Sequence, residues 1–145
     1  MKKLYTLAFF GMLTTLVHAQ VSVTLQVDMN EQTVSADGVH VAGEFQGWDP
    51  MATPLSDDDM DGVWEVTLDL APGTHPYKFI NGMSWDSVED VPPTCQVEVA
   101  GNDNRFMIIA EDVTEVSSLV CFGSCAACGM STIRMRVDMS VESAV

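Results

Sequence analysis

The sequence predicts an all-β fold, namely an immunoglobulin-like sandwich of antiparallel strands. Short segments alternate apolar and polar residues, which is the period of a half-buried strand. Turn residues separate these segments at short intervals, and beyond the first 19 residues no stretch shows convincing helical periodicity. Seven short strands with this spacing are typical of such a sandwich.

The expected strands follow one another along the chain. The first, Val21-Ser-Val-Thr-Leu-Gln-Val27, alternates strictly. The turn residues Pro72-Gly73 follow the third strand, and Asn81-Gly82, a hairpin turn signal, follows the fourth. The seven segments are residues 21–27, 39–42, 63–70, 76–80, 96–99, 105–109 and 116–121.

The first 19 residues have the pattern of a secretory signal peptide. Lys2-Lys3 gives a positive start, residues 4–17 are apolar, and Val17-His-Ala19 places small residues at a cleavage site before Gln20. A membrane anchor is the alternative, but the apolar run is shorter than the ~20 residues that a span needs. We therefore expect a secreted or cell-surface protein that is not inserted in a membrane after cleavage.

The chain is strongly acidic. Its 145 residues include 21 Asp and Glu against 6 Lys and Arg, which gives a formal net charge of −15. Nucleic acid binding needs a basic face that neutralises phosphates, and an anionic membrane surface also attracts basic segments. Neither a nucleic-acid partner nor an anionic membrane surface is therefore expected.

The four cysteines, Cys95, Cys121, Cys125 and Cys128, are even in number in a chain that we expect to be secreted. Two disulfides are therefore expected. Of the three connectivities, we favour Cys95–Cys121 with Cys125–Cys128, which joins two late strands beside a tight C-x-x-C loop. A zinc site of four cysteines and a thioredoxin-like redox motif are the alternatives.

The end of the chain repeats its first expected strand. Residues 133–139, Ile-Arg-Met-Arg-Val-Asp-Met, match the alternation of residues 23–29, Val-Thr-Leu-Gln-Val-Asp-Met, at an offset of a full module. We therefore expect one module over residues 20–130 and the truncated start of a second copy over residues 131–145, as in a protein with tandem copies. Chance similarity of two strands is the alternative. The last segment is not expected to pack as an internal strand of the first sandwich.

No catalytic motif is found. The sequence lacks G-x-S-x-G, H-E-x-x-H and a phosphate-binding loop. Beyond the expected leader only His40 and His75 remain, and His40 is expected to face solvent. A glycosidase pair needs one carboxyl in an apolar pocket, and a sandwich this small rarely holds a deep cleft. The module is therefore not expected to be an enzyme, and no cofactor is expected apart from a calcium ion.

That calcium ion is suggested by Asp57-x-Asp59-x-Asp61-Gly62. This matches the opening of an EF-hand-like loop, with oxygen ligands at alternate positions and a glycine at the sharp turn. The position of the bidentate glutamate is occupied by Leu68. An acidic, solvated hairpin loop is the alternative.

Two tryptophans, Trp48 and Trp85, lie in or beside turns, as does Lys78, whereas Trp64 lies within a strand and is expected in the core. An exposed indole presents a flat apolar face with a polar edge. The C–H face of a pyranose ring stacks on such a surface, while nearby polar groups bind the hydroxyls. The alternative for both turn tryptophans is packing against the sandwich.

These residues belong to a pattern that resembles a glycogen- and starch-binding module. The pattern is Val39-His-Val-Ala-Gly-Glu-Phe-Gln-Gly-Trp48, then Asp61-Gly-Val-Trp-Glu-Val-Thr-Leu-Asp-Leu-Ala-Pro-Gly-Thr-His-Pro-Tyr-Lys-Phe79, then Trp85. It is similar to the glycogen-binding domain of the AMP-activated protein kinase β subunit, to the N-terminal module of isoamylase-type enzymes and to repeated modules of secreted bacterial multidomain proteins. The resemblance covers about residues 36–110.

The resemblance implies an immunoglobulin-like sandwich with a sugar site. The implied site residues are Trp48, Lys78, Trp85 and Asn104, with Asn102 as the alternative to Asn104. The sequence therefore predicts a secreted, non-catalytic module that binds α-glucan by stacking on tryptophan. A structural or adhesion repeat of a larger surface protein, and the N-terminal part of a larger glycan-active enzyme, are the alternatives.

Overall fold

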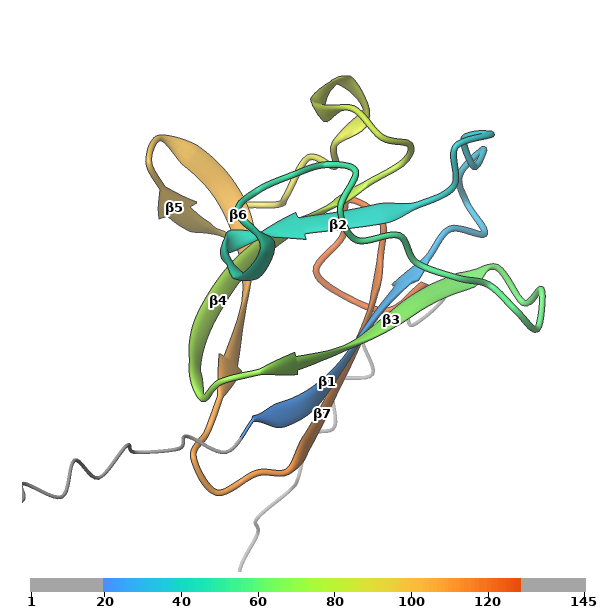
Figure 1. Ribbon diagram of the computed structural model, residues 1–145. Coiled ribbons are helices and arrows are strands. Elements are labelled where there is room, and N and C mark those ends of the chain that lie inside the picture. The colour runs from blue at the N-terminus through green and yellow to red at the C-terminus, as the bar shows by residue number, and fades with distance from the viewer. Residues whose placement is uncertain (1–19, 129–145) are drawn as a thin grey trace, which may run out of the picture.

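The computed structural model describes residues 20–128. Within them the chain forms two β-sheets that face each other, as the arrangement of the strands in Figure 1 shows. The predicted signal peptide and the predicted start of a second module lie outside the described residues. Residues 20–128 include no helix that is both long and apolar enough to cross a lipid bilayer.

All seven expected strands are present, and the predicted β-sandwich is confirmed. The strands are β1 (Val21–Asp28), β2 (His40–Gly43), β3 (Val63–Leu70), β4 (Gly73–Ile80), β5 (Val97–Val99), β6 (Asn102–Ile109) and β7 (Glu115–Cys121). Sheet A has the order β3-β1-β7, and sheet B has the order β2-β4-β6-β5. Helical structure in the described residues is confined to two short 3-10 turns, η1 (Glu44–Gln46) and η2 (Trp85–Ser87).

One strand pair differs from the antiparallel arrangement expected from the sequence. β1 is antiparallel to β3 but parallel to β7, with Leu25 opposite Ser118. The reason is that β6 belongs to sheet B, so the chain crosses between the sheets before β7 begins. A crossover of this kind allows a parallel pair, whereas a tight hairpin does not.

The core lies between the sheets, and the alternation of β1 predicts it correctly. Val23, Leu25 and Val27 are fully buried, while the residues between them are only partly buried. Phe79 of sheet B packs in the same cluster, and Trp64 packs against its edge as expected. His40 was expected to face solvent but is buried, because β2 lies between β4 and the segment that contains Pro54.

The four cysteines form two disulfides, but the favoured pairing was wrong. The bonds are Cys95–Cys125 and Cys121–Cys128. After β7 the chain turns back, and the Cys121 amide donates a hydrogen bond to the Ala126 carbonyl. This turn places Cys128 beside Cys121, with 5.2 Å between their Cα atoms, and leaves Cys125 beside Cys95 at 5.6 Å. Residues 121–128 are called the cysteine loop below.

Candidate functional site

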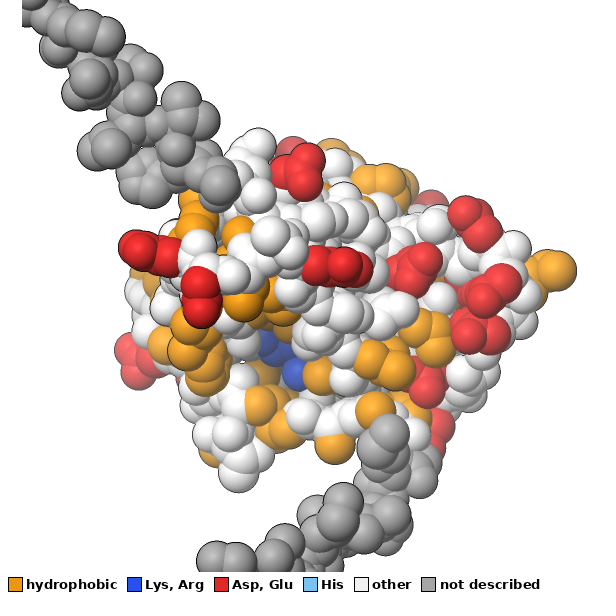
Figure 2. All heavy atoms as spheres, turned by 90° about the horizontal axis from the view of Figure 1, so that it is seen from below, with side chains coloured by type: hydrophobic (Ala, Val, Ile, Leu, Met, Phe, Trp, Pro, Cys, Tyr) orange, Lys and Arg blue, Asp and Glu red, His pale blue; other side chains and the backbone are white. Residues whose placement is uncertain are grey.

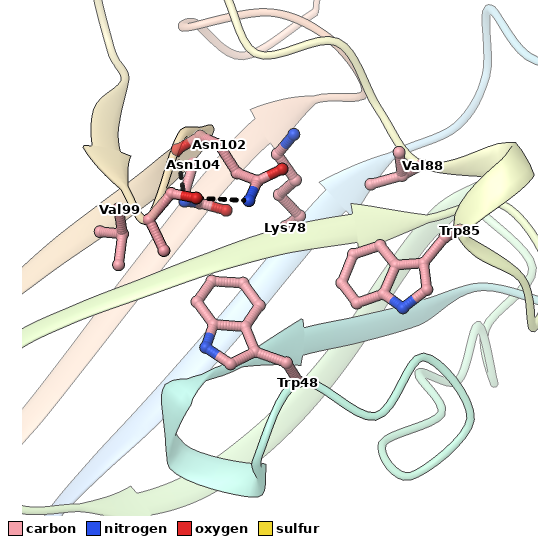
Figure 3. A pocket seen from close by; sticks show the side chains of 8 residues that line it. Trp48, Lys78, Trp85, Val88, Val99, Asn102 and Asn104 are labelled. Carbon is pink, nitrogen blue, oxygen red and sulfur yellow. Dashed lines mark hydrogen bonds between the residues drawn. The ribbon is translucent and has the colours of Figure 1, made fainter.

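A pocket of about 450 Å³ lies on the side of sheet B that faces away from the core. Its walls come from the η1 and η2 loops, from β4, and from the β5–β6 hairpin (Figure 3). It is lined by Trp48, Lys78, Trp85, Val88, Val99, Ala100, Asn102 and Asn104. The structure thus brings together all four site residues that the resemblance implied, and the alternative Asn102.

Trp48 is held at the end of the η1 turn by a strained but well-bonded loop. Its φ angle is 62°, in the left-handed region that a non-glycine residue rarely adopts. Its amide donates to the Gly43 carbonyl at 2.9 Å. The side chain of Gln46 braces the same loop, because its amide group donates to the Val41 and Asp49 carbonyls and accepts from the Asp49 amide. Gln46 is therefore a support of the site that the sequence pattern did not reveal.

Trp85 begins the η2 turn in the loop that follows β4. The expected turn signal Asn81-Gly82 does end that strand, but it opens a longer loop instead of a tight hairpin. The loop closes where Ile80 and Val88 form a β-bridge. The Ser84 hydroxyl accepts a hydrogen bond from the Asp86 amide and so caps the turn. Trp85 is 42% exposed, and its indole extends from this capped turn.

The two indoles form a pair. Their ring centroids are 6.5 Å apart, and their planes are tilted by 40°. Figure 3 shows them side by side, with Lys78, Asn102 and Asn104 lying across the pocket from them. The pocket therefore offers two apolar faces at an angle and a group of polar side chains opposite.

The polar side comes from neighbouring strands of sheet B. Tyr77 of β4 is paired with Arg105 of β6, so the next residue of β4, Lys78, lies level with Asn104. The side-chain Nδ2 of Asn104 donates to the backbone carbonyl of Asn102 at 2.8 Å, and the side-chain Nδ2 of Asn102 donates to the backbone carbonyl of Ala100 at 3.3 Å. Asn104 is almost fully buried, whereas Asn102 is exposed.

The tip of the β5–β6 hairpin forms another wall that the sequence pattern did not reveal. Ala100 and Gly101 both have positive φ angles, 53° and 80°, and connect the paired residues Val99 and Asn102. Two central residues with positive φ are the mark of a type I′ turn. An Ala-Gly pair is a weak signal for that turn, because alanine pays a steric cost there. Val99 and Ala100 thus enter the pocket from a turn that only the backbone pairing identifies.

Lys78 supplies the positive charge of the pocket. Lys78 and Arg105 are the only Lys and Arg residues in the described range, and Arg105 is buried. Acidic side chains are scattered over the face shown in Figure 2, where basic atoms are visible only within a hollow. In residues 20–128, Lys78 is thus the one Lys or Arg side chain that is not buried, and it lies among the aromatic and amide groups of the pocket.

The three aspartates of the candidate calcium loop lie close together but are engaged in the loop itself. Oxygen atoms of Asp57, Asp59 and Asp61 lie within 4.8 Å of one another. The Asp57 carboxylate accepts hydrogen bonds from the Asp61 and Gly62 amides, and the Asp61 carboxylate accepts one from the Val63 amide. These bonds form the turn before β3, so the geometry is compatible with a solvated acidic loop as well as with a cation site.

A family model, "Glycogen recognition site of AMP-activated protein kinase", matches residues 29–115. The chain belongs to this family. The match includes every residue that lines the pocket, and it ends before the cysteine loop. The resemblance inferred from the sequence is thereby confirmed. The family is a glycogen-recognition module and not a catalytic domain, which agrees with the sequence prediction for this module.

A solved structure gives the same fold. The chain is similar to the glycoside hydrolase family 15 glucoamylase from Hypocrea jecorina, with a TM-score of 0.53 and 22% sequence identity. The similarity covers 77% of this chain and 19% of the glucoamylase chain, so this chain spans about a fifth of that enzyme's length. Among curated proteins, no sequence matches the chain.

Proposed function

We propose that this module is a non-catalytic binder of α-glucan, such as starch or glycogen, and that sugar rings stack on Trp48 and Trp85. Lys78 and Asn104 donate hydrogen bonds to the hydroxyls of the same rings. The observation that carries the proposal is the pair of tilted indoles in one pocket with Lys78, within the part of the chain that matches the glycogen-recognition family.

The tilt of the indoles favours a curved glycan. Successive glucose units of an α-1,4-linked chain turn relative to one another, so two neighbouring rings present faces at an angle. Indole planes inclined by 40° fit such a chain better than they fit the flat ribbon of a β-1,4-linked glucan. The acidic surface is no obstacle, because starch and glycogen chains are essentially neutral.

The site is open and takes few sugar units, so binding by one module is expected to be weak. Tandem copies would compensate, because a second module bound to the same polysaccharide acts at a high effective concentration. The repeat of the first strand in residues 133–139 supports such an arrangement. The two disulfides support secretion, since such bonds persist in oxidising compartments.

The alternative of a structural or adhesion repeat requires that both tryptophans serve only to pack the loops. The 42% exposure of Trp85 disfavours it. The other alternative, part of a larger glycan-active enzyme, agrees with the glucoamylase likeness, in which the chain spans 19% of the enzyme. In that case this module would deliver the enzyme to its polysaccharide, and the pocket would keep the same role.

Affinity electrophoresis in gels that contain amylose or glycogen tests the proposal. The wild-type protein should be retarded, and Trp85→Ala should migrate as in a gel without polysaccharide. Thr67→Ala is the matched control, because Thr67 lies on the outer face of sheet A, where its hydroxyl forms a hydrogen bond with the hydroxyl of Thr24. Unchanged wild-type mobility, or retardation of Trp85→Ala equal to wild type, would refute the proposal.

A further inference from the structure

Beneath the pocket lies a buried ion pair that the sugar site itself does not use. Glu89 and Arg105 are 2% and 3% exposed. The Arg105 Nε donates to Glu89 Oε1 at 2.7 Å, and its Nη2 donates to Glu89 Oε2 at 2.6 Å. Such a forked pair fixes both the distance and the orientation of its partners.

Backbone groups from two further segments complete this cluster. The Phe79 amide donates to Glu89 Oε1 at 2.9 Å, and the Gly123 amide donates to Glu89 Oε2 at 3.1 Å. The Cys121 carbonyl accepts from Arg105 Nη2 at 3.2 Å. The guanidinium also lies over the Phe79 ring, 5.7 Å from its centroid. The two buried charges are thus compensated by each other and by backbone groups of β4 and the cysteine loop.

Members of this cluster stand next to pocket residues in the sequence. Phe79 follows Lys78 in β4, and Arg105 follows Asn104 in β6. Glu89 follows Val88 at the end of the loop that carries Trp85. Successive residues of an extended chain point to opposite sides. The cluster therefore lies on the core side of these segments and holds them together, while their opposite side forms the pocket.

A buried ion pair is a poor source of stability, because desolvation offsets most of the attraction between its charges. Its forked geometry is better suited to setting the relative positions of the segments that it joins. The cysteine loop takes part through Gly123 and Cys121, and it is tied back by the Cys95–Cys125 and Cys121–Cys128 bonds.

We propose that Glu89 and Arg105 are positioning residues of the glucan site. Their ion pair fixes the positions of Lys78, Asn104 and the Trp85 loop relative to one another, and the cysteine loop is part of the same assembly. The inference rests on the proposed function. It assigns a role in binding to a loop that lies beyond the residues matched by the family model.

The test compares Glu89→Gln and Arg105→Lys with a destabilised variant whose site is intact. Glu89→Gln keeps the shape but removes the charge, and Arg105→Lys keeps the charge but removes the fork. Leu25→Ala is the matched control, because it opens a cavity in the core at β1, on sheet A. Affinity for maltoheptaose is measured by calorimetry at a temperature where each variant is folded by its own melting curve. If Glu89→Gln does not fold, Arg105→Lys provides the measurement.

The expected result is a loss of affinity of at least tenfold in Glu89→Gln and Arg105→Lys and unchanged affinity in Leu25→Ala. A second readout needs no sugar. Two indoles whose centroids are 6.5 Å apart give an exciton couplet in circular dichroism, which Trp85→Ala removes and which both charge variants should alter. Wild-type affinity in either folded charge variant, or an equal loss in Leu25→Ala, would overturn the inference.

The cysteine loop is tested by replacing Cys95 and Cys125 together with serine. This double variant should lose affinity several-fold while it stays folded, and wild-type affinity would exclude the loop from the assembly.

The outcomes also separate the two proposals. If wild-type protein binds and Trp85→Ala does not, normal binding by Glu89→Gln overturns only the positioning role. If wild-type protein fails to bind, the proposed function is wrong, and the couplet still reports on the geometry.

Discussion

The outer faces of the two sheets differ. In sheet A, β1 alternates strictly between buried and partly buried residues, whereas in sheet B all of β2 is buried. On sheet A, outward residues form polar cross-strand pairs: Thr24 is hydrogen-bonded to Thr67, and the Gln26 side chain donates a hydrogen bond to the Glu65 carboxylate. On sheet B, the outward side carries the aromatic pocket and, beyond it, the exposed side chains of Phe106 and Ile108. The outer face of sheet A is thus mainly polar, with Leu119 of β7 as an exposed large hydrophobic residue, whereas the outer face of sheet B carries the pocket and two more exposed apolar side chains.

The contrast shows that the pocket arises where loops fold over the outward face of a sheet. Burial of one face of each sheet fixes the core residues, so the outward positions are free to vary. On sheet B the two tryptophans come from loops that fold over the strands, and the strands supply Lys78 and Asn104. Sheet A is thus called the stabilising layer, and sheet B with the loops that fold over it is called the binding layer; substitutions can test this division.

The largest effect is expected from two substitutions of Trp48. Both Trp48→Ala and Trp48→Gly remove an indole of the pocket, and each should reduce glucan affinity about 30-fold, or about 2 kcal/mol. The two should differ in stability. Because residue 48 has a φ of 62°, glycine avoids a steric cost that alanine pays, so Trp48→Gly should be about 1 kcal/mol more stable than Trp48→Ala. Chemical denaturation and calorimetry measure the two quantities.

Equal stability of the two Trp48 variants would show that the backbone relaxes out of the left-handed region when the indole is absent. The loop would then be shaped by the indole and not by the Gln46 and Gly43 hydrogen bonds. Retained affinity in both variants would instead remove Trp48 from the binding layer.

A smaller effect concerns the inner face of sheet B, where Tyr77 is buried. Burial raises the pKa of Tyr77 above its ordinary value of 10.0, and the nearby Arg105 only partly opposes this rise. The unfolded chain therefore loses this proton at lower pH than the folded protein. Above pH 10.0 the free energy of unfolding should fall, by at most about 1.4 kcal/mol per pH unit for this group, until the folded-state pKa is passed.

Tyr77→Phe is the control for that prediction, since it removes the titrating hydroxyl and keeps the ring. Urea denaturation of both proteins as a function of pH measures the difference, which should grow above pH 10.0. A constant difference across the same range would mean that the hydroxyl titrates like that of a free tyrosine, and the pKa would not be raised.

The smallest effect is expected at the acidic loop before β3. If Asp57, Asp59 and Asp61 bind calcium, a few millimolar Ca²⁺ at an affinity of about 1 mM should stabilise the protein by about 1 kcal/mol. A thermal melt with and without Ca²⁺ measures this, and Asp59→Asn should abolish the shift. A melting temperature that Ca²⁺ does not change identifies the loop as a solvated acidic turn whose carboxylates only accept hydrogen bonds from the backbone.

Particular residues show how far the sequence could predict the structure. The buried positions of β1 were predictable, because an alternating strand with one face on a core has one register that buries its valines. Trp48, Lys78, Trp85 and Asn104 were predictable from the family pattern. Ala100 was not, because its place in the pocket depends on a turn conformation that alanine rarely adopts. The disulfide pairing was not predictable either, because it depends on how the chain turns after β7.

The sandwich and its core follow from the amino-acid sequence, because alternation and turn chemistry are local properties of the chain, and the residues of the site follow from the family pattern. Packing of the two sheets fixed what those properties leave open. It set the parallel pairing of β7, the 40° tilt between the indoles and the pairing of the cysteines. It also brought Glu89 beneath the pocket to meet Arg105, since contacts between distant segments exist only after the two sheets pack together.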